Sequence, residues 1–384
     1  MTAGDTPTDR GETPLEAKIK ERIRRGGAIG VAEYMAFCLD DPNYGYYRRR
    51  PAIGAGGDFV TAPEISQVFG ELIGLWCAVV WQQMGAPGRL NLVELGPGRG
   101  TLMRDCLRAA KIVPGFRAAL TVHLVDRNAT LRDVQQAALA DSGVPFRFHA
   151  DATDALQSPS QIAGEPTVIL ANEFLDAMPV EQWQHVDGAW RARQVALDAT
   201  DGGFCFQPDL TPAIAPRSVP LTLKPSEGDI FEVSPAIDAL ASSLRARADR
   251  APLAALFIDY GHAASGFGDT LQGVSGHSYV SPFYRPGETD LSAQIDFQRF
   301  GETCRASGLT TDGPVPQAEL LGRLGLVERA SRLMSVNPDK AGAIEAAAQR
   351  LLAPSGMGSR FLALGVRSAD LAPLPGLAPS PGLA

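Results

Sequence analysis

One stretch of the sequence, NLVELGPGRGTLMRD at residues 91–105, constrains the fold more than any other. An apolar run is followed by Gly96, Gly98 and Gly100, and a run that favours helix begins immediately after them. Glycine adopts positive φ without strain and lets a ligand lie against bare backbone. A helix N-terminus behind such a loop attracts an anionic group, a carboxylate as well as a phosphate. The stretch therefore predicts a strand, a tight ligand-binding turn and a helix.

Strands and helices alternate along much of the remaining chain. Short apolar runs separated by helical patterns indicate a parallel sheet with helices on both faces, which predicts an α/β fold of the Rossmann-like type. The predicted strands are 91–95, 121–125, 145–150, 167–171 and 253–258, and the predicted helices lie near 101–111, 130–141, 236–248 and 316–325.

Two insertions of β character interrupt this series. In the first, at about 179–225, an Asp187-Gly188 turn lies between two alternating arms, which predicts a hairpin. The second, at about 261–315, is rich in glycine and proline and is too long for an idle loop. The core with its insertions is accordingly expected to span 91–370.

Residues 15–90 are predicted to form a helical N-terminal segment with a lid. Its first helices are expected at 15–25 and 31–39. Thr61 and Glu64 have the spacing of a capping box, so a long helix is expected to start there.

The loop before that helix, residues 57–64, is expected to fold over a bound ligand as the lid and to bring Thr61 and Pro63 to it. The two ends of the chain, 1–14 and 371–384, are rich in proline and small residues and are expected to be poorly ordered.

Acidic side chains follow the predicted strands at the edge where open α/β sheets bind ligands. Asp126, after the second strand, can bind both ribose hydroxyls, and Asp151, after the third, can accept from an adenine amino group. Glu94 precedes the glycine loop, and Thr101 replaces the last glycine of a dinucleotide fingerprint. The pattern favours a nucleoside ligand other than a dinucleotide; the alternative is a structural turn with incidental acids.

The fourth predicted strand leads into Asn172 and Glu173, with Asp176 close behind. Because they follow a strand at the same edge, the first two should face the reacting groups. Their alternative role is that of a helix cap. Asp259 and Asp296, at a strand end and a helix start, are predicted to be structural caps.

The composition excludes several classes of protein. A formal net charge of −8 argues against a sequence-independent hold on nucleic acid. Five scattered cysteines without a C-x-x-C pair indicate neither disulfides nor a metal site. No apolar run approaches the length of a membrane span, and the polar N-terminus does not resemble a targeting peptide. A cytoplasmic protein is therefore expected.

Seven motifs occur in a fixed order within roughly residues 30–370. They are GDFVTAPEISQVFGELIGLW (57–76), VELGPGRGTLMRDCLR (93–108), ANEFLDAMPVEQW (171–183), FEVSP (231–235), LFIDYGH (256–262), GDTLQGVSGH (268–277) and PGETDLSAQIDF (286–297). Together they resemble the MidA-type methyltransferases, which include the mitochondrial arginine methyltransferase that assists assembly of respiratory complex I.

This resemblance implies a class I methyltransferase fold, S-adenosylmethionine as cofactor and an arginine on a complex I protein as acceptor. The predicted cofactor-binding residues are Glu94, Gly96, Gly98, Gly100, Asp126, Asp151, Thr61 and Pro63, and the predicted catalytic residues are Glu173, Asn172, Asp176 and His277. A small-molecule methyltransferase and a non-catalytic assembly factor with a retained cofactor site are the alternatives. A protein substrate and a homodimer are the expected partners.

An arginine acceptor is protonated in water, so carboxylates would have to hold the ion. Glu173 and Asp176 are the candidates for this role, with His277 as a proton acceptor or, alternatively, an ordinary loop residue. The sequence departs from the family pattern in two places: the residues that follow Asp126, and Gln294, where the family favours histidine.

Overall fold

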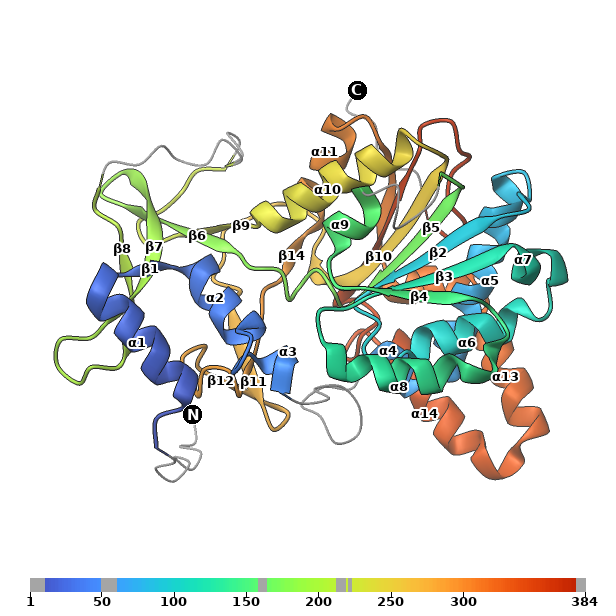
Figure 1. Cartoon of the computed structure of the whole chain (residues 1–384), viewed down its shortest axis with the longest axis horizontal. Helices are drawn as coiled ribbons and strands as arrows, with labels where there is room; N and C mark the ends of the chain where they lie inside the picture. Colours follow the sequence, from blue (N-terminus) through green and yellow to red (C-terminus); the bar gives the residue numbers. More distant parts are fainter. Residues whose placement is uncertain (1–10, 50–60, 158–163, 212–218, 220–222, 378–384) are drawn as a thin grey trace.

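The computed structural model describes residues 11–49, 61–157, 164–211, 219 and 223–377 (Figure 1). An α/β core lies at the right of the view, and a smaller β-rich region with the N-terminal helices lies at the left. The first half of the predicted lid, 57–60, and most of the predicted N-terminal tail fall outside the described residues.

The central sheet of the core is built from β2 (Leu90–Leu95), β3 (Leu120–Val125), β4 (Phe146–His149), β5 (Thr167–Asn172), β10 (Leu253–His262), β15 (Thr310–Pro316) and β16 (Phe361–Arg367), with β14 (Ile295–Asp296) beside the end of β10. Parallel strands run in the order β4-β3-β2-β5-β10, and antiparallel β16 and β15 extend the sheet. The Rossmann-like α/β prediction is confirmed. β3 and β4 lie on one side of β2, whereas the next strands along the chain, β5 and β10, lie on its other side. Ligands bind at the carboxyl ends of the strands where the strand order changes direction in this way, so they are expected at the carboxyl ends of β2 and β5.

Helices cover both faces of this sheet (Figure 1). Leu92 and Val93 of β2 point to opposite faces, so each buried strand contributes to two apolar cores. One face carries α4 (Ala62–Ile65), α5 (Gln67–Gln83), α6 (Thr101–Ala110), α7 (Pro114–Ala119), α8 (Ala129–Leu139), α12 (Gln317–Arg323), α13 (Leu326–Val336) and α14 (Ala341–Leu352). The other carries α9 (Ala152–Gln157), α10 (Pro235–Ala248) and α11 (Phe297–Ala306).

The β-rich region joins the start of the chain to both insertions. Its helices are α1 (Pro14–Gly26), α2 (Val31–Asp40) and α3 (Tyr46–Arg49), and its strands are β1 (Ile29–Gly30), β6 (Glu181–Val186), β7 (Ala189–Leu197), β8 (Phe204–Pro208), β9 (Ile230–Val233), β11 (Gln272–Ser275), β12 (Ser278–Val280) and β13 (Asp290–Ser292). β1 pairs with β7, and Leu15, Val195 and Leu291 share one apolar core. The first part of the predicted N-terminal segment, α1 to α3, thus packs with the insertions, whereas α4 and α5 of the same predicted segment pack on the central sheet.

The predicted hairpin of the first insertion is present. Asp187 and Gly188 connect β6 to antiparallel β7, with φ of 53° and 73°. Two successive positive φ values are what a type I′ turn requires, and Asp-Gly is a preferred pair for it.

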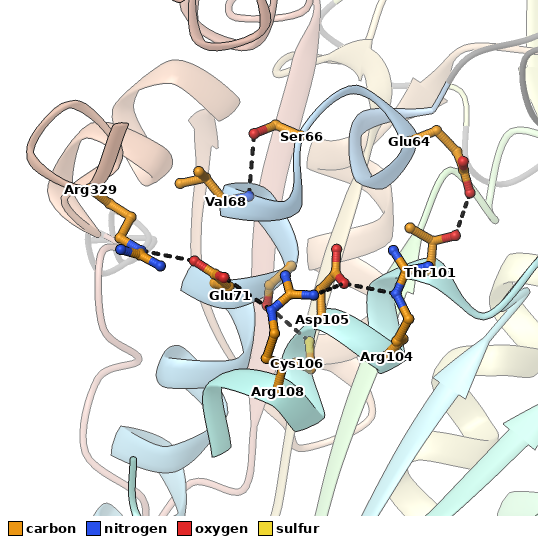
Figure 2. Close-up of polar contacts among 11 residues, drawn as sticks. Glu64, Ser66, Val68, Glu71, Thr101, Arg104, Asp105, Cys106, Arg108 and Arg329 are labelled. Atoms are coloured by element: carbon orange, nitrogen blue, oxygen red, sulfur yellow. Dashed lines mark hydrogen bonds and ion pairs between the residues drawn. The ribbon is translucent and has the colours of Figure 1, made fainter. Parts of the chain in front are cut away.

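The prediction that the long helix starts at Thr61 is wrong. α4 ends at Ile65, and Ser66 begins α5 by accepting the N–H of Val68 on its hydroxyl at 3.2 Å (Figure 2). The Thr61 side chain makes no cap bond, and Glu64 accepts instead from the hydroxyl of Thr101. The capping-box acid is therefore used to tie α4 to α6.

Part of each predicted tail is ordered by contacts with the rest of the chain. The Trp76 indole donates to the Pro375 carbonyl at 2.9 Å, and the N–H of Leu374 donates to Asp312 at 3.0 Å, so disorder from residue 371 is wrong for 371–377. At the other end Thr13 caps α1 by accepting the N–H of Glu16 at 3.0 Å. Buried contacts to the core order both segments despite their composition.

Candidate active site

The glycine loop connects β2 to α6 at the point where the strand order reverses. Gly96, Gly98 and Gly100 have φ of 67°, 51° and 78°, a region in which any side chain would be strained. A Cβ at Gly96 would also lie 2.8 Å from the ring of Phe174. The tight turn expected from the sequence is therefore formed, and it leaves bare backbone at the carboxyl end of β2.

Behind this loop, α5 and α6 touch through their backbones (Figure 2). A Cβ on Gly74 would lie 2.6 Å from the Cα and the carbonyl oxygen of Cys106, and one on Gly70 would lie 2.6 Å from the Cβ of Asp105. The Cys106 thiol donates to the Gly70 carbonyl at 3.2 Å. Two glycines one helical turn apart thus set the position of α6, whose first turn carries the loop.

Buried charges fix the same helices (Figure 2). Glu71 on α5 accepts from Arg108 on α6 at 3.1 Å and from Arg329 on α13 at 2.8 Å. Asp105 accepts from Arg108 at 2.9 Å and from Arg104 at 3.0 Å. Both carboxylates are buried, and hydrogen bonds with charged partners stabilise more than neutral ones. The network therefore holds three helices in register behind the loop.

A cavity with two chambers opens beside the loop. The large chamber has a volume of about 380 Å³, within the usual range for small-molecule sites. The small chamber, about 40 Å³, shares Thr61, Gly96, Gly98 and Glu173 with it, so the two lie side by side. The predicted site residues that line the chambers are Thr61, Pro63, Glu94, Gly96, Gly98, Asp126, Asp151, Asn172, Glu173 and Asp176.

Asp126 is coupled to the glycine loop by a glutamine that the sequence analysis does not single out. One carboxylate oxygen of Asp126 accepts the N–H of Asn128 at 2.8 Å, and the other accepts from the Gln135 amide at 3.0 Å. The same amide donates to the Gly98 carbonyl at 2.8 Å. Burial raises the pKa of the Asp126 carboxyl. Gln135 lies within α8, where helical periodicity marks a buried position but not this contact.

Asp151 lies at the side of the large chamber that faces the N-terminal helices. Arg127 pairs with it at 3.3 Å and with Asp40 of α2 at 2.6 Å. Arg48 of α3 donates to the Arg127 carbonyl at 2.7 Å. The start of the chain therefore closes this side of the cavity.

Glu173 occupies a strained position directly after β5. Its φ is 53°, which is uncommon for a residue other than glycine and is often associated with functional sites. Its Oε1 accepts the N–H of Ala62 at 3.0 Å and the amide of Asn172 at 3.1 Å. The carboxylate thus joins the loop after β5 to the first turn of α4.

Asp259, in the second half of β10, orders the residues that follow Glu173. Its Oδ2 accepts the N–H groups of Phe174, Leu175 and Asp176 at 3.0, 2.8 and 3.2 Å. The side chain is fully buried. The predicted capping role is observed, and it fixes the direction of the loop that presents Asp176 to the cavity.

Besides Asp126, burial raises the pKa of three further carboxyls in the cavity wall. The pKa of Glu94 is raised to about 8, with a further contribution from Asp126, and those of Glu173 and Asp176 are each raised to about 7. Within the described part of the chain, none of these three forms an ion pair. Carboxyls perturbed in this way concentrate at functional sites.

The lining of the large chamber also includes residues that were not predicted, among them Tyr47, Tyr260, Asp290 and Phe361. The Tyr47 hydroxyl donates to Asp290 at 3.0 Å, across the boundary between α3 and the second insertion. The sequence signal for Asp290 is its place in the PGETDLS motif, but its neighbour Tyr47 is remote in sequence. The charged residues around this chamber are Asp40, Asp126, Asp151, Glu173, Asp176, Asp290 and Arg127.

Six acids against one arginine make the large chamber attractive to cations. A positively charged cofactor group and a protonated acceptor could both be stabilised there. The chemistry of the lining thus complements two cations beside a nucleoside-binding loop.

Comparison with known proteins decides the family. Residues 72–315 match the sequence model of the S-adenosyl-L-methionine-dependent methyltransferases. The chain belongs to this family. Protein arginine methyltransferase NDUFAF7 of Danio rerio is 33% identical to it over 89% of this chain and 84% of that protein. The Homo sapiens protein of the same name is 31% identical, over 94% and 85%.

A solved structure agrees with this methyltransferase fold. A COG1565 superfamily member from Burkholderia thailandensis, bound to S-adenosyl-homocysteine, has a TM-score of 0.79 and 25% identity, and the match covers 94% of this chain and 93% of that one. The methyltransferase described here uses S-adenosylmethionine, as the sequence predicts.

Two acceptor atoms in the small chamber fit the amino-acid end of that cofactor. Glu94 Oε2 and Asn172 Oδ1 are buried and find no donor among the described residues. An ammonium group would donate a hydrogen bond to each of these oxygens. Without such a donor, a buried acceptor costs free energy. Asp126 lines the large chamber, where it can accept from ribose hydroxyls. The residues present therefore fit both the amino-acid end and the ribose of the cofactor.

Two predicted site residues lie elsewhere. His277 is exposed in the turn between β11 and β12, with φ of 62°, and lines neither chamber, because the hairpin directs it away from the carboxyl ends of β2 and β5. Gly100 caps α6 and packs against Gln135 of α8, so its role is to admit that helix and not to contact the cavity.

The expectation of a cytoplasmic protein is wrong, because the curated relatives are named as mitochondrial proteins. Among the helices that the structure describes, none is long and apolar enough to cross a membrane. The described residues also contain no group of three or more His, Cys, Asp or Glu side chains placed to hold a metal.

Proposed function

We propose that this methyltransferase methylates an arginine side chain of a protein, and that the protein is a subunit of respiratory complex I. The observation that carries the arginine acceptor is the acid-lined large chamber beside the glycine loop. The name protein arginine methyltransferase, carried by relatives over most of their length, supports the same acceptor. The complex I subunit rests on the resemblance to the MidA-type family.

The cofactor-binding residues divide between the two chambers. Glu94 and Asn172 would hold the ammonium group, and the backbone of Gly96 and Gly98 would lie along the ligand. Asp126 would bind the ribose hydroxyls, braced by Gln135. When bound, the cofactor supplies a methyl group on a positively charged sulfur.

The acceptor side is formed by Glu173, Asp176 and Asp290, with the Tyr47 and Tyr260 hydroxyls beside them. A guanidinium in this position would find carboxylates that fix its plane and leave the attacking nitrogen directed at the methyl group. Holding two reactants in line is the main source of rate in such a displacement. Exclusion of water by Tyr47 and Phe361 would strengthen each of these contacts.

The chain's own residues would hold the guanidinium nitrogen in line with the methyl group and accept one proton from it. The bound cofactor would supply the methyl group and leave as a neutral thioether, so that one carbon–sulfur and one nitrogen–hydrogen bond would be exchanged for one carbon–nitrogen and one oxygen–hydrogen bond. The methylated guanidinium keeps its positive charge after losing one proton from the attacking nitrogen. Glu173 or Asp176 can take that proton, because a carboxylate with a pKa of about 7 is matched to neutral pH.

Labelled methyl transfer tests the proposal. The purified chain is incubated with methyl-labelled S-adenosylmethionine and complex I from a deletion strain, and the labelled residue is identified by mass spectrometry. Label on an arginine is expected, and none with Gly98→Val. Label on a small molecule, or on another residue type, would refute the proposal that the acceptor is arginine. Label on an arginine outside complex I would refute only the proposal that the substrate is a complex I subunit.

Absence of any transfer while S-adenosyl-homocysteine still binds would favour the assembly-factor alternative. The predicted homodimer remains a prediction, checked on the same material by sedimentation velocity.

A further inference from the structure

A second cavity lies outside the chambers described above. It has a volume of about 310 Å³ and lies among β9, the first turns of α10, the segment after β10, β14 and the start of α11. None of the residues that line it lines either chamber. Val180 and Ile237 face this cavity, whereas the residues before them, Pro179 and Ala236, face the large chamber. A single layer of chain therefore separates the two spaces.

One wall of the second cavity is a bonded polar network. Glu232 accepts from the Gln182 amide at 2.7 Å and from the N–H of Thr270 at 3.1 Å. The Thr270 hydroxyl bonds to Glu232 and accepts the N–H of Gln294 at 2.9 Å. This bonding holds Glu232 and the backbone of Gln294 at the cavity surface. Phe267 and Phe300 add aromatic rings to the lining.

The charges in this lining do not balance. Glu232, Asp238 and Asp296 are the acids, and Arg299 is the one cation among the lining residues. Arg299 pairs with Asp238 at 2.7 Å. Asp296 caps α11 through the N–H of Arg299 at 2.9 Å, and the groups of the described residues that donate to Glu232 are an amide, a backbone N–H and a hydroxyl, all uncharged. Two carboxylates therefore face the cavity without an ion pair among the described residues, and burial raises the pKa of Glu232.

We propose that the second cavity binds a lysine or arginine side chain of the protein substrate, beside the arginine that enters the large chamber. The inference rests on the proposed function, since it supplies a second contact to the same substrate. The aliphatic stem of a basic side chain packs on apolar walls, and its charged end is attracted by aromatic faces and by carboxylates. An anion would meet two uncompensated acids, and a purely apolar group would desolvate them without a partner.

Gln294 offers a direct test, because it is exposed, lines the cavity and is held through its backbone and not its side chain. Gln294→Lys places a cation beside the two acids, Gln294→Glu adds a third acid, and Gln294→Met is the neutral control. Gln349→Lys, at an exposed position of α14, is a matched control with the same change in net charge. The probe is a fluorescein-labelled hexapeptide of glycine and lysine without arginine, followed by fluorescence anisotropy.

Low-salt binding to the wild-type chain is expected, and Gln294→Lys is expected to weaken it about tenfold, the scale of one like charge a few ångströms away at intermediate dielectric. Gln294→Glu should tighten it, Gln294→Met and Gln349→Lys should leave it within about twofold, and about 1 M salt should erase the differences. Affinity for S-adenosyl-homocysteine should stay the same in all four variants. No binding to wild type, or equal binding by wild type and Gln294→Lys, would overturn the proposal.

The lysine probe carries no arginine, so the two proposals can fail separately. If no arginine is methylated but probe binding depends on Gln294, the basic side-chain site stands and the proposed acceptor falls. If arginine is methylated and Gln294→Lys leaves the KM of a lysine-flanked arginine peptide unchanged, the arginine acceptor is supported and the binding of a basic side chain in the second cavity is refuted.

Discussion

Replacing Glu173 by glutamine would remove the charge from the loop after β5 while keeping the size and shape of the side chain. Glutamine keeps an oxygen that can accept from the N–H of Ala62 and the amide of Asn172, so the contact with α4 can persist. The change removes a carboxyl whose pKa is raised to about 7 by burial. Because the folded protein holds this proton more tightly than the unfolded chain, the ionised form opposes folding, by roughly 4 kcal/mol at about 1.4 kcal/mol per pKa unit.

The sign of the effect follows from that direction. The cost to folding grows as pH rises from the unfolded pKa of about 4.3 toward 7 and is complete above it. Glu173→Gln should therefore equal wild type near pH 4 and exceed it in free energy of unfolding by up to about 4 kcal/mol at pH 8. A neutral side chain cannot hold a guanidinium, so turnover should fall at least about a hundredfold, the scale of a lost preorganised contact.

Three measurements on the same variant check this reasoning: urea unfolding at pH 5 and pH 8, calorimetry with S-adenosyl-homocysteine, and methyl transfer. Cofactor affinity should be nearly unchanged. In the wild type the rate should rise through about pH 7, as Glu173 and Asp176 ionise as a pair. A variant that is less stable at both pH values and fully active would mean that Glu173 only caps α4.

The other predictions concern the loop and its support. Gly74→Ala should destabilise the protein by about 1–3 kcal/mol, because the added Cβ would meet the Cys106 backbone. The control Gly322→Ala, in a helix with open space around the glycine, should stabilise it by about 1 kcal/mol. Equal effects of the two changes in urea unfolding would contradict the close packing of α5 and α6. Asp126→Ala should weaken S-adenosyl-homocysteine by about 1–3 kcal/mol in calorimetry with the fold intact, and unchanged affinity would place the ribose contact elsewhere. Gly98→Val should abolish the thermal shift caused by S-adenosyl-homocysteine, because valine strains a loop residue with φ of 51°, and a retained shift would refute this.

The parallel half of the sheet could be predicted because its signals are local. β2, β3 and β5 are short apolar runs followed by turns, and acids directly after them must lie at one edge of the sheet. Asp126 and Glu173 were found for that reason. β15 and β16 were not predicted, since their antiparallel pairing at the sheet edge joins segments about fifty residues apart.

The rest of the site depends on contacts that sequence spacing does not encode. Gln135 reaches Asp126 from a helix, and Tyr47 reaches Asp290 from the opposite end of the chain. The capping-box spacing at Thr61 was misleading because Glu64 accepts instead from Thr101 of another helix. In each case a tertiary hydrogen bond outweighs the local pattern.

The pairing of β1 with β7 has a consequence for biosynthesis. Ile29 must remain without its partner Val195 until the first insertion has been made, and Leu291 of the same apolar core is made later still. At translation speeds of about 5–20 residues per second, that interval is on the order of ten seconds. During it, α1 and α2 expose the apolar faces that the finished protein buries. The nascent chain is therefore a natural client for chaperones, and the large chamber becomes complete only after the ribosome has passed Phe361.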